Sequence, residues 1–237
     1  MSSRLGLEAL LWLRHRPWFL QSWYRREEHA LKAKRVVRPT DELVIDGYPR
    51  SANTFATHAI FLSQGEDIRI GNHMHNPAQF VLAARYAVPA MLLLRNPVDA
   101  CASHMLQRGW RDPADALLRY IAFHRDLPER EHFVVAPFEE VTTDFNKCID
   151  RLNARFGTAF APFEHSDASR DEVFEHMTSA SAERIRHFGE GHHTELGKSL
   201  PTNEKKALGA EIKVLFDRRS TRALRLVAEK LYSRLRS

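Results

Sequence analysis

The sequence predicts an α/β fold in which helices flank a central parallel sheet of four or five strands. Short apolar runs alternate along the chain with segments that repeat apolar residues at helical spacing. Strands that alternate with helices form parallel sheets covered on both faces. The runs expected to be strands are residues 43–45, 68–70, 91–94 and 133–135. The segments expected to be helices are residues 54–63, 98–107, 144–156 and 221–235.

Length and composition indicate one globular domain with a sizeable core. The chain has 237 residues, of which 43% are hydrophobic and 27% charged. Cys101 and Cys148 are too few for a disulfide framework or a cysteine-based zinc site. No stretch reaches the ~20 apolar residues of a membrane span, and the apolar start at residues 5–13 lacks a cleavage site of the signal-peptide kind. We therefore expect a cytoplasmic protein.

The net charge of +5 is unevenly distributed along the chain. Residues 1–40 carry nine Lys or Arg against three Asp or Glu, and residues 213–237 carry eight against two. Each of these ends is therefore +6, which leaves −7 for residues 41–212. Proteins that bind nucleic acid spread basic charge along a binding face. The acidic centre therefore argues against nucleic acid as a partner.

Residues 1–40 differ in composition from the rest, and we predict a basic, aromatic, helical arm before the α/β domain at 41–237. Trp12, Trp18 and Trp23 are three of the four tryptophans, and they interleave with arginines. Two interpretations stay open. The arm packs its aromatic face on the domain, or it lies on a membrane with its tryptophans at headgroup depth. We expect the packed arm, and the second interpretation predicts peripheral membrane contact.

Two turns are candidate ligand sites, because ligands of parallel sheets bind beyond the carboxyl ends of strands. The first turn, residues 47–54, joins a strand to a helix. Such a turn aims backbone N–H groups and the positive helix end at one point, which suits phosphate or sulfate. The G-x-x-x-x-G-K-[ST] loop of magnesium-dependent nucleotide triphosphatases is absent. The side chains of the turn that add donors or positive charge are Arg50, Ser51, Asn53 and Thr54.

The second turn begins with Arg95 at the end of the apolar run 91–94. Pro97 suits the first position of the following helix, because its missing N–H costs no hydrogen bond there. Ser103 lies about two helical turns further along, at a spacing that lets Arg95 and Ser103 converge on one phosphate. The sequence therefore has two anion-binding turns in order, each between a strand and a helix.

The two turns resemble the cofactor-binding motifs of sulfotransferases that use 3′-phosphoadenosine-5′-phosphosulfate (PAPS). Residues 48–55, YPRSANTF, are similar to Y-P-K-S-G-T-T-W, and residues 95–103 match R-N-P-x-D-x-x-x-S at every fixed position. Arg50 keeps the positive charge of the usual Lys, and Ala52 in place of Gly implies a backbone that avoids positive φ. By this resemblance Arg95 and Ser103 hold the 3′-phosphate. The implied cofactor-binding residues of the two motifs are Arg50, Ser51, Ala52, Asn53, Thr54, Phe55, Arg95 and Ser103.

Transfer to a hydroxyl needs a base, and histidine has the most suitable unperturbed pKa. His73 and His75 lie between the two turns, and the H-x-P sequence that begins at His75 is similar to the T-H-x-P pattern of the family. We expect His75 to be the base, with His73 as the second candidate, and Arg50 to stabilise the leaving oxygen. Two other interpretations are structural histidines and a metal site shared with the His192–His193 pair. No Cys or carboxylate at ligand spacing supports the metal site.

Residues 195–202 resemble the closing loop of the family, in which G-x-W-K precedes Thr and a helix. Lys198 falls on the Lys of that pattern, the Trp is missing, and Lys198 and Arg186 are predicted to be further cofactor contacts. The resemblance covers about residues 41–210. It implies a P-loop-like three-layer fold and a metal-independent, in-line sulfuryl transfer from PAPS to a hydroxyl of a sugar, lipid-linked sugar, phenol or small alcohol. Two alternatives are a P-loop phosphotransferase that uses ATP and a non-catalytic membrane-associated protein with vestigial anion sites.

Overall fold

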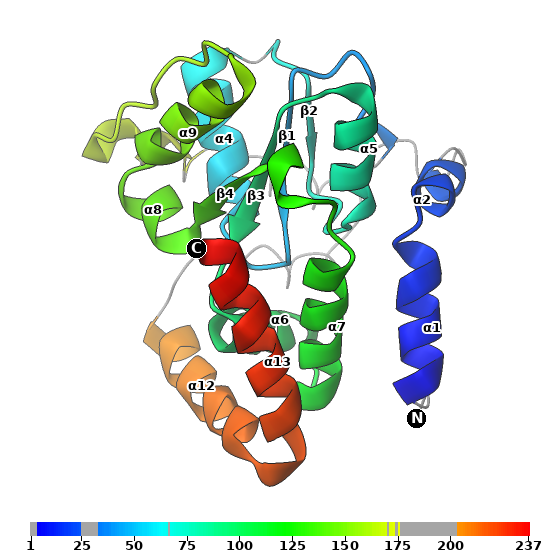
Figure 1. Ribbon diagram of the computed structural model, residues 1–237. Helices are drawn as coiled ribbons and strands as arrows, with labels where there is room; N and C mark the ends of the chain where they lie inside the picture. Colours follow the sequence, from blue (N-terminus) through cyan, green and yellow to red (C-terminus); the bar gives the residue numbers. More distant parts are fainter. Residues whose placement is uncertain (1–3, 25–32, 66, 170, 174, 176–202) are drawn as a thin grey trace, which may run out of the picture.

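A four-stranded parallel sheet forms the centre of the computed structural model (Figure 1). The structure describes residues 4–24, 33–65, 67–169, 171–173, 175 and 203–237. The strand order is β2-β1-β3-β4, and helices cover both faces of the sheet. The predicted α/β class with four or five parallel strands is therefore confirmed. The strands are β1 (Leu43–Gly47), β2 (Ile70–Asn72), β3 (Ala90–Leu94) and β4 (Val134–Pro137).

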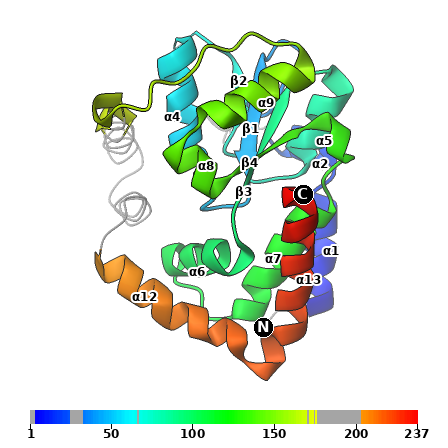
Figure 2. The ribbon, with the colours of Figure 1, turned by 60° about the vertical axis from the view of Figure 1, so that its left-hand side comes forward.

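Helices connect the strands and form the outer layers (Figures 1 and 2). The helices expected at 54–63, 98–107 and 221–235 correspond to α4, α6 and α13. In chain order the described helices are α1 (Arg4–Arg14), α2 (Pro17–Tyr24), α4 (Asn53–Gln64), α5 (Ala78–Tyr86), α6 (Pro97–Arg108), α7 (Pro113–Arg125), α8 (Phe138–Thr143), α9 (Asn146–Phe156), α12 (Asn203–Val214) and α13 (Arg219–Arg236), with the 3₁₀ turns η2 (Arg130–His132) and η4 (Leu215–Asp217).

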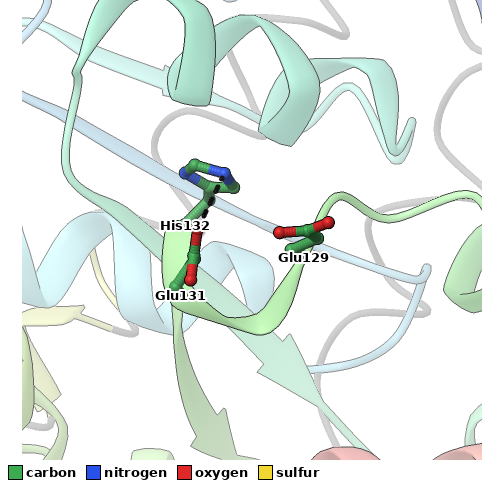
Figure 3. A group of neighbouring side chains, drawn as sticks. All are labelled: Glu129, Glu131 and His132. Carbon is green, nitrogen blue, oxygen red and sulfur yellow. Dashed lines mark ion pairs between the residues drawn. The ribbon is translucent and has the colours of Figure 1, made fainter.

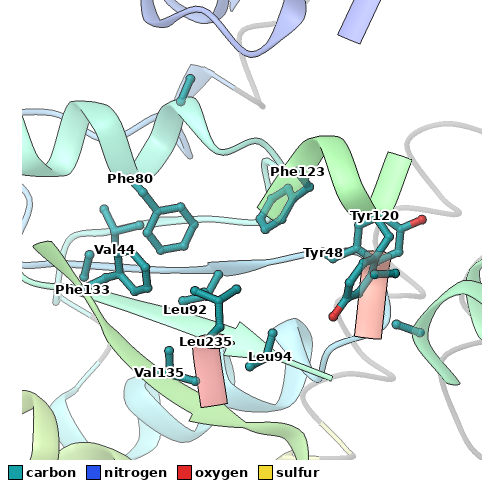
Figure 4. Close-up of a cluster of buried hydrophobic side chains, with 14 of the residues drawn as sticks. Val44, Tyr48, Phe80, Leu92, Leu94, Tyr120, Phe123, Phe133, Val135 and Leu235 are labelled. Carbon is teal, nitrogen blue, oxygen red and sulfur yellow. The ribbon is translucent and has the colours of Figure 1, made fainter. Parts of the chain in front are cut away.

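The strands β1 and β3 are buried on both faces, because successive side chains point to opposite sides of the sheet. Leu43 and Ile45 contribute to a core with residues of α4 and α9. Val44 and Leu92 point the other way, into a core with residues of α5, α7 and α13 (Figure 4). Burial on both faces is why these strands are unbroken apolar runs in the sequence.

Three elements begin later in the chain than the sequence predicts. The strands expected at 68–70 and 133–135 begin later, at Ile70 and Val134, where pairing with β1 and β3 begins. The helix expected at 144–156 begins at Asn146, because Asp144 has a non-helical backbone, with φ −153°, and is the C-cap of the separate helix α8. Helices α5 and α7 were not predicted, and tertiary packing against the sheet and α6 supports them.

The arm packs on the domain through leucines, so the expectation that its aromatic face packs is wrong. Leu7 and Leu11 of α1 form an apolar cluster with Leu118 and Ala122 of α7. Leu20 of α2 belongs to the larger core. Trp12, Trp18 and Trp23 are exposed instead. The reason is helical geometry: residues four apart, such as Leu7 and Leu11, share a face that leaves Trp12 outside it. In the described part of the chain, none of the helices has the length and apolar character needed to cross a membrane.

Candidate functional site

The first turn presents the start of α4 without a side-chain cap. Ala52 is the N-cap residue, and its methyl side chain accepts no hydrogen bond from the first turn of the helix. The first N–H groups of a helix have no acceptor within the helix, and the helix dipole makes this end positive. The start of α4, beyond the carboxyl end of β1, therefore has the geometry of an anion-binding site.

Two residues of this turn have left-handed backbones, and the expectation that Ala52 avoids positive φ is wrong. The φ angle is +72° at Arg50 and +68° at Ala52. The chain reverses from β1 into α4 within a few residues, and left-handed residues allow so sharp a reversal. Each such residue costs on the order of 1–3 kcal/mol and persists where its surroundings determine it, often at functional sites. Left-handed residues in a turn also help to aim successive N–H groups at one point.

Tyr48 anchors the first turn against α6 and α7. Its hydroxyl donates to the carbonyl oxygen of Ala116 at 3.2 Å, and Nδ1 of His104 lies 3.2 Å from the same hydroxyl. Its backbone oxygen accepts from Asn53 Nδ2 at 3.2 Å. Burial lowers the pKa of His104 to about 3, with further lowering by nearby Arg108, so this imidazole is neutral at pH 7. The contacts of Tyr48 with Ala116 and His104 thus fix the turn, and the neutral His104 adds no positive charge to it.

The structure brings residues of the two turns together. Arg50 Nε donates to Ser103 Oγ at 2.9 Å, across 53 positions of sequence. Arg95 Nη1 donates to the backbone oxygen of Arg50 at 2.8 Å, across 45 positions. Because β1 and β3 are neighbours, the turns that follow them meet at the same edge of the sheet. Arg50, Arg95 and Ser103 therefore line one continuous site.

The guanidinium groups of Arg50 and Arg95 make this site electropositive, and burial lowers the pKa of both. The pKa of Arg50 falls to about 10, first because of burial and then because of the neighbouring Arg95 charge. Burial also lowers the pKa of Arg95, and the nearby Asp99 and Glu139 carboxylates oppose this change. Both guanidinium groups remain charged at pH 7. Binding of an anion beside these two cations is favoured, because its negative charge would offset both their burial and their mutual repulsion.

The second turn differs from the first because its helix is already capped. Asn96 Oδ1 accepts from the N–H groups of Val98 at 3.0 Å and Asp99 at 3.3 Å. Pro97 stands in the first turn of α6, as the sequence predicted. The backbone N–H groups at the start of α6 therefore have a protein acceptor. An anion at this turn would be bound through the side chains of Arg95 and Ser103.

His75 has one ring nitrogen held by the protein and the other without a hydrogen-bond partner among the described residues. Its Nδ1 lies 2.8 Å from the backbone oxygen of Gly47. A carbonyl oxygen only accepts, so the neutral ring carries its proton on Nδ1. The lone pair is then on Nε2, and the side chain is 31% exposed. In this tautomer Nε2 is able to accept a proton, as a general base must.

His73 lies beside His75 but contacts the first turn differently. Its Nε2 is 3.3 Å from Thr54 Oγ1, and its Nδ1 is 3.0 Å from Asn72 Oδ1. The two imidazole rings are 5.9 Å apart, centroid to centroid. Both ring nitrogens of His73 therefore have side-chain neighbours within hydrogen-bonding distance. This arrangement suits orientation of Thr54 better than proton transfer.

Asp46, which the sequence analysis missed, holds the histidine segment in place. Its carboxylate is fully buried and accepts from the backbone N–H groups of Gly47 at 2.8 Å, Met74 at 2.9 Å and His75 at 3.0 Å. One of its oxygens lies 3.5 Å from His75 Nδ1. His73 and His75 have φ angles of +53° and +50°, so the segment needs this support. The available signal was a carboxylate inside an otherwise apolar strand.

We expect Asp46→Asn to lower both stability and turnover. The amide keeps the shape but replaces one accepting oxygen by a donor that faces N–H groups, which leaves buried donors unsatisfied at about 1–3 kcal/mol. Thermal unfolding and steady-state kinetics would measure both effects. Asp41→Asn is the matched control, since Asp41 accepts a backbone N–H near the other end of β1 but is more exposed. Equal behaviour of the two variants would contradict the role given to Asp46.

Buried polar atoms near the first turn provide a further test of whether a phosphosulfate group fits. Among the described residues, Ser51 Oγ, Asn53 Oδ1 and Thr57 Oγ1 are buried without a hydrogen-bond partner. Buried polar groups normally have partners. The Ser51 hydroxyl can donate to an anion bound at the turn, together with the start of α4. The residues present therefore fit a phosphate- or sulfate-bearing ligand.

Other predicted contacts lie elsewhere or beyond the described residues. The Phe55 side chain is buried in the core and packs edge-on against Phe163, at 6.1 Å between centroids, so it is a core residue. Lys198 and Arg186, and the pair His192–His193 considered as metal ligands, lie outside the residues that the structure describes.

A group of possible metal ligands lies away from the two turns. Within the described chain, Glu129, Glu131 and His132 bring ligand atoms within 4.8 Å of one another (Figure 3). They belong to the segment around η2, at the amino end of β4, whereas the two turns follow the carboxyl ends of the parallel strands. Both glutamates are exposed, and exposed acidic groups are common without a metal. We therefore do not assign this group to the site.

Comparisons with known proteins give one weak structural match. No family model matches the chain, and no curated protein matches it. A crystal structure of mouse sulfotransferase SULT7A1 complexed with PAP is similar over 83% of this chain and 90% of that chain, at 13% identity and a TM-score of 0.34. A match this weak assigns no reaction to the chain.

Proposed function

We propose that the protein is a sulfotransferase that moves a sulfuryl group from PAPS onto a hydroxyl-bearing acceptor. The observation that carries the proposal is the junction of the two turns. Two segments that independently resemble PAPS-binding motifs are joined by the hydrogen bonds from Arg50 to Ser103 and from Arg95 to Arg50. The adjacent parallel strands β1 and β3 bring the two turns to one edge of the sheet, and the two guanidinium groups held together there favour one anionic ligand.

The donor would be held by both turns. PAPS supplies an activated sulfuryl group on a phosphosulfate. The N–H groups at the start of α4, with Ser51 and Thr54, would bind the phosphosulfate. Arg95 and Ser103 would bind the 3′-phosphate. Ser103 Oγ accepts from Arg50 in the structure, so its own hydroxyl hydrogen remains available to a phosphate oxygen.

The remaining residues would handle charge and proton. Arg50 would stabilise the negative charge that develops on the leaving oxygen, by preorganised electrostatics. His75 Nε2 would accept the proton of the acceptor hydroxyl, since Nδ1 is held by Gly47. Asp46, 3.5 Å from Nδ1, would stabilise the imidazolium that results. These roles are all filled by protein groups, and the proposal assigns none to a metal.

The direct test is a transfer assay with radiolabelled PAPS against sugar, lipid-linked sugar, phenol and small-alcohol acceptors. We expect transfer of label that persists when a chelator is added. A P-loop phosphotransferase would instead transfer phosphate from ATP and require Mg²⁺. Labelled phosphate transfer from ATP, without any transfer from PAPS, would overturn the proposal. PAPS binding without turnover on every acceptor would favour the non-catalytic alternative.

Recognition of the 3′-phosphate gives a separate prediction. The product nucleotide 3′,5′-adenosine bisphosphate should bind far better than adenosine monophosphate. Arg95→Ala should weaken binding of the bisphosphate by about tenfold to a hundredfold, since a hydrogen bond to a charged group contributes roughly 1.5–3 kcal/mol. Calorimetry on both nucleotides would measure this. Arg85→Ala, at an exposed position of α5, is the matched control, and equal affinities of the wild type for the two nucleotides would contradict the assignment.

A further inference from the structure

Exposed apolar side chains are concentrated on the arm. Nine large hydrophobic residues are exposed in the described chain, and five of them lie in α1 and α2. Single exposed apolar residues are ordinary on soluble proteins, but a group on two short helices indicates a contact surface. The five, with their exposed fractions, are Leu5 (79%), Leu10 (47%), Trp12 (53%), Trp18 (58%) and Trp23 (39%).

On α1 the exposed residues form a stripe of their own. Leu5, Ala9 and Trp12 follow one another at spacings of four and three, which aligns them on one side of the helix. Leu7 and Leu11, which pack on α7, lie on the opposite side. The helix therefore has an inner apolar face that holds it to the domain and an outer apolar face that contributes nothing to that packing.

On α2 three aromatic rings form a cluster, and two of them, Trp18 and Trp23, are exposed. Phe19 stacks on Trp23 at 5.5 Å between centroids, and Trp18 packs edge-on against Phe19 at 5.9 Å. Leu20 and Pro17 are the buried residues of this helix. The outer surface defined by Leu5, Trp12, Trp18, Phe19 and Trp23 is called the aromatic surface below.

Polar contacts keep the arm in the orientation that exposes the aromatic surface. His15 lies between α1 and α2, and its Nδ1 is 2.7 Å from a carboxylate oxygen of Asp126, which follows α7. Gln21 Nε2 donates to the Tyr86 hydroxyl at 2.8 Å. Asn76 Nδ2, one residue after His75, donates to the Arg14 oxygen at 2.9 Å. Contacts on both helices thus hold the arm to the domain, and the aromatic surface is its outer face.

The positive charge of residues 1–40 indicates an anionic partner for the aromatic surface. Residues 1–40 carry a net charge of +6, and the Arg16 guanidinium lies 4.1 Å from the centroid of the Trp12 ring. Tryptophan beside arginine suits the headgroup region of a bilayer, and basic residues are attracted to anionic lipid. A second copy of the chain on the same surface would bring two +6 arms together, which electrostatics opposes. We propose that the aromatic surface of α1 and α2 docks on an anionic lipid bilayer.

Vesicle flotation of the full-length protein tests the proposal. We expect flotation with phosphatidylcholine–phosphatidylserine vesicles at an ionic strength of about 0.1 M and weaker flotation as added salt screens the charge. The double variant Trp12→Ser, Trp18→Ser should lower the partition coefficient by about tenfold or more, because both rings expose apolar area that a bilayer would bury. Brominated lipid should quench the tryptophan fluorescence of the wild type and quench that of the variant less.

The matched control is the double variant Leu226→Ser, Val227→Ser on α13, which removes apolar residues of similar exposure away from the arm. It should float like the wild type, and both variants should melt within a few degrees of it, because exposed substitutions change stability little. If the Trp12, Trp18 variant floats as well as the wild type, the proposal is overturned. The proposal is also overturned if the wild type does not float at low salt. A dimer in light scattering that depends on the arm, or oligonucleotide binding that depends on the arm and occurs without flotation, would overturn it as well.

Discussion

Replacing His75 with alanine should lower turnover by about 10²–10⁴-fold and leave nucleotide binding nearly unchanged. The reason is the asymmetry of the ring. Its Nδ1 is 2.8 Å from the Gly47 oxygen, so the proton is on Nδ1 and the lone pair on Nε2 is available to an acceptor hydroxyl. The histidine reaches neither Arg95 nor Ser103 through any hydrogen bond of the described residues, so binding of the 3′-phosphate should not depend on it.

Steady-state kinetics with PAPS, together with calorimetry on the bisphosphate, would separate the two effects. His73→Ala is the matched comparison, since His73 belongs to the same segment and contacts Thr54 instead. We expect His73→Ala to lower turnover much less. Full activity in His75→Ala with loss of activity in His73→Ala would make His73 the base. Activity in both single variants would place the base outside this segment.

Replacing Arg50 with alanine should lower turnover by about 10²–10³-fold, the loss typical when one preorganised donor to a developing negative charge is removed. Although burial and Arg95 lower its pKa to about 10, Arg50 stays charged at pH 7. Arg50→Lys keeps the charge but loses the forked geometry that allows Nε to bond Ser103. The lysine variant should therefore recover part of the turnover.

The diagnostic quantity is the ratio of the loss in kcat to the loss in nucleotide affinity. An interaction made mainly in the transition state lowers kcat more than it weakens binding of the product nucleotide. Arg111→Ala, just after α6 and exposed, is the control for a general loss of positive charge. If Arg50→Ala binds nucleotide poorly yet turns over at the wild-type rate at saturation, Arg50 serves binding alone.

The sheet and both turns could be predicted because local sequence specifies them. Strands buried on both faces must be continuous apolar runs, and β1 and β3 have that pattern. The pairing of Arg95 with Pro97 after an apolar run indicates a strand followed at once by a helix. Because the strands are parallel, their carboxyl ends share an edge, and both turns lie at that edge.

Backbone conformation inside the first turn could not be predicted in the same way. Ala52 is left-handed although alanine disfavours that region, and His73 and His75 are left-handed as well. Local preference predicts none of these angles. Contacts with distant groups compensate for them: Asp46 holds the histidine segment through the N–H groups of Met74 and His75, and Tyr48 holds the turn through Ala116 and His104.

The sequence by itself determined the α/β class, the two strand-to-helix turns and the presence of two histidines between them, because each depends on residues close together in the chain. Only the tertiary structure distinguished His75 from His73, since that distinction depends on the Gly47 oxygen and the Asp46 carboxylate of β1. It also decided which face of the arm is buried. Leucine and tryptophan are both apolar, so composition could not tell the inner face from the outer one. Packing of Leu7 and Leu11 on α7 settled that choice and left the tryptophans exposed.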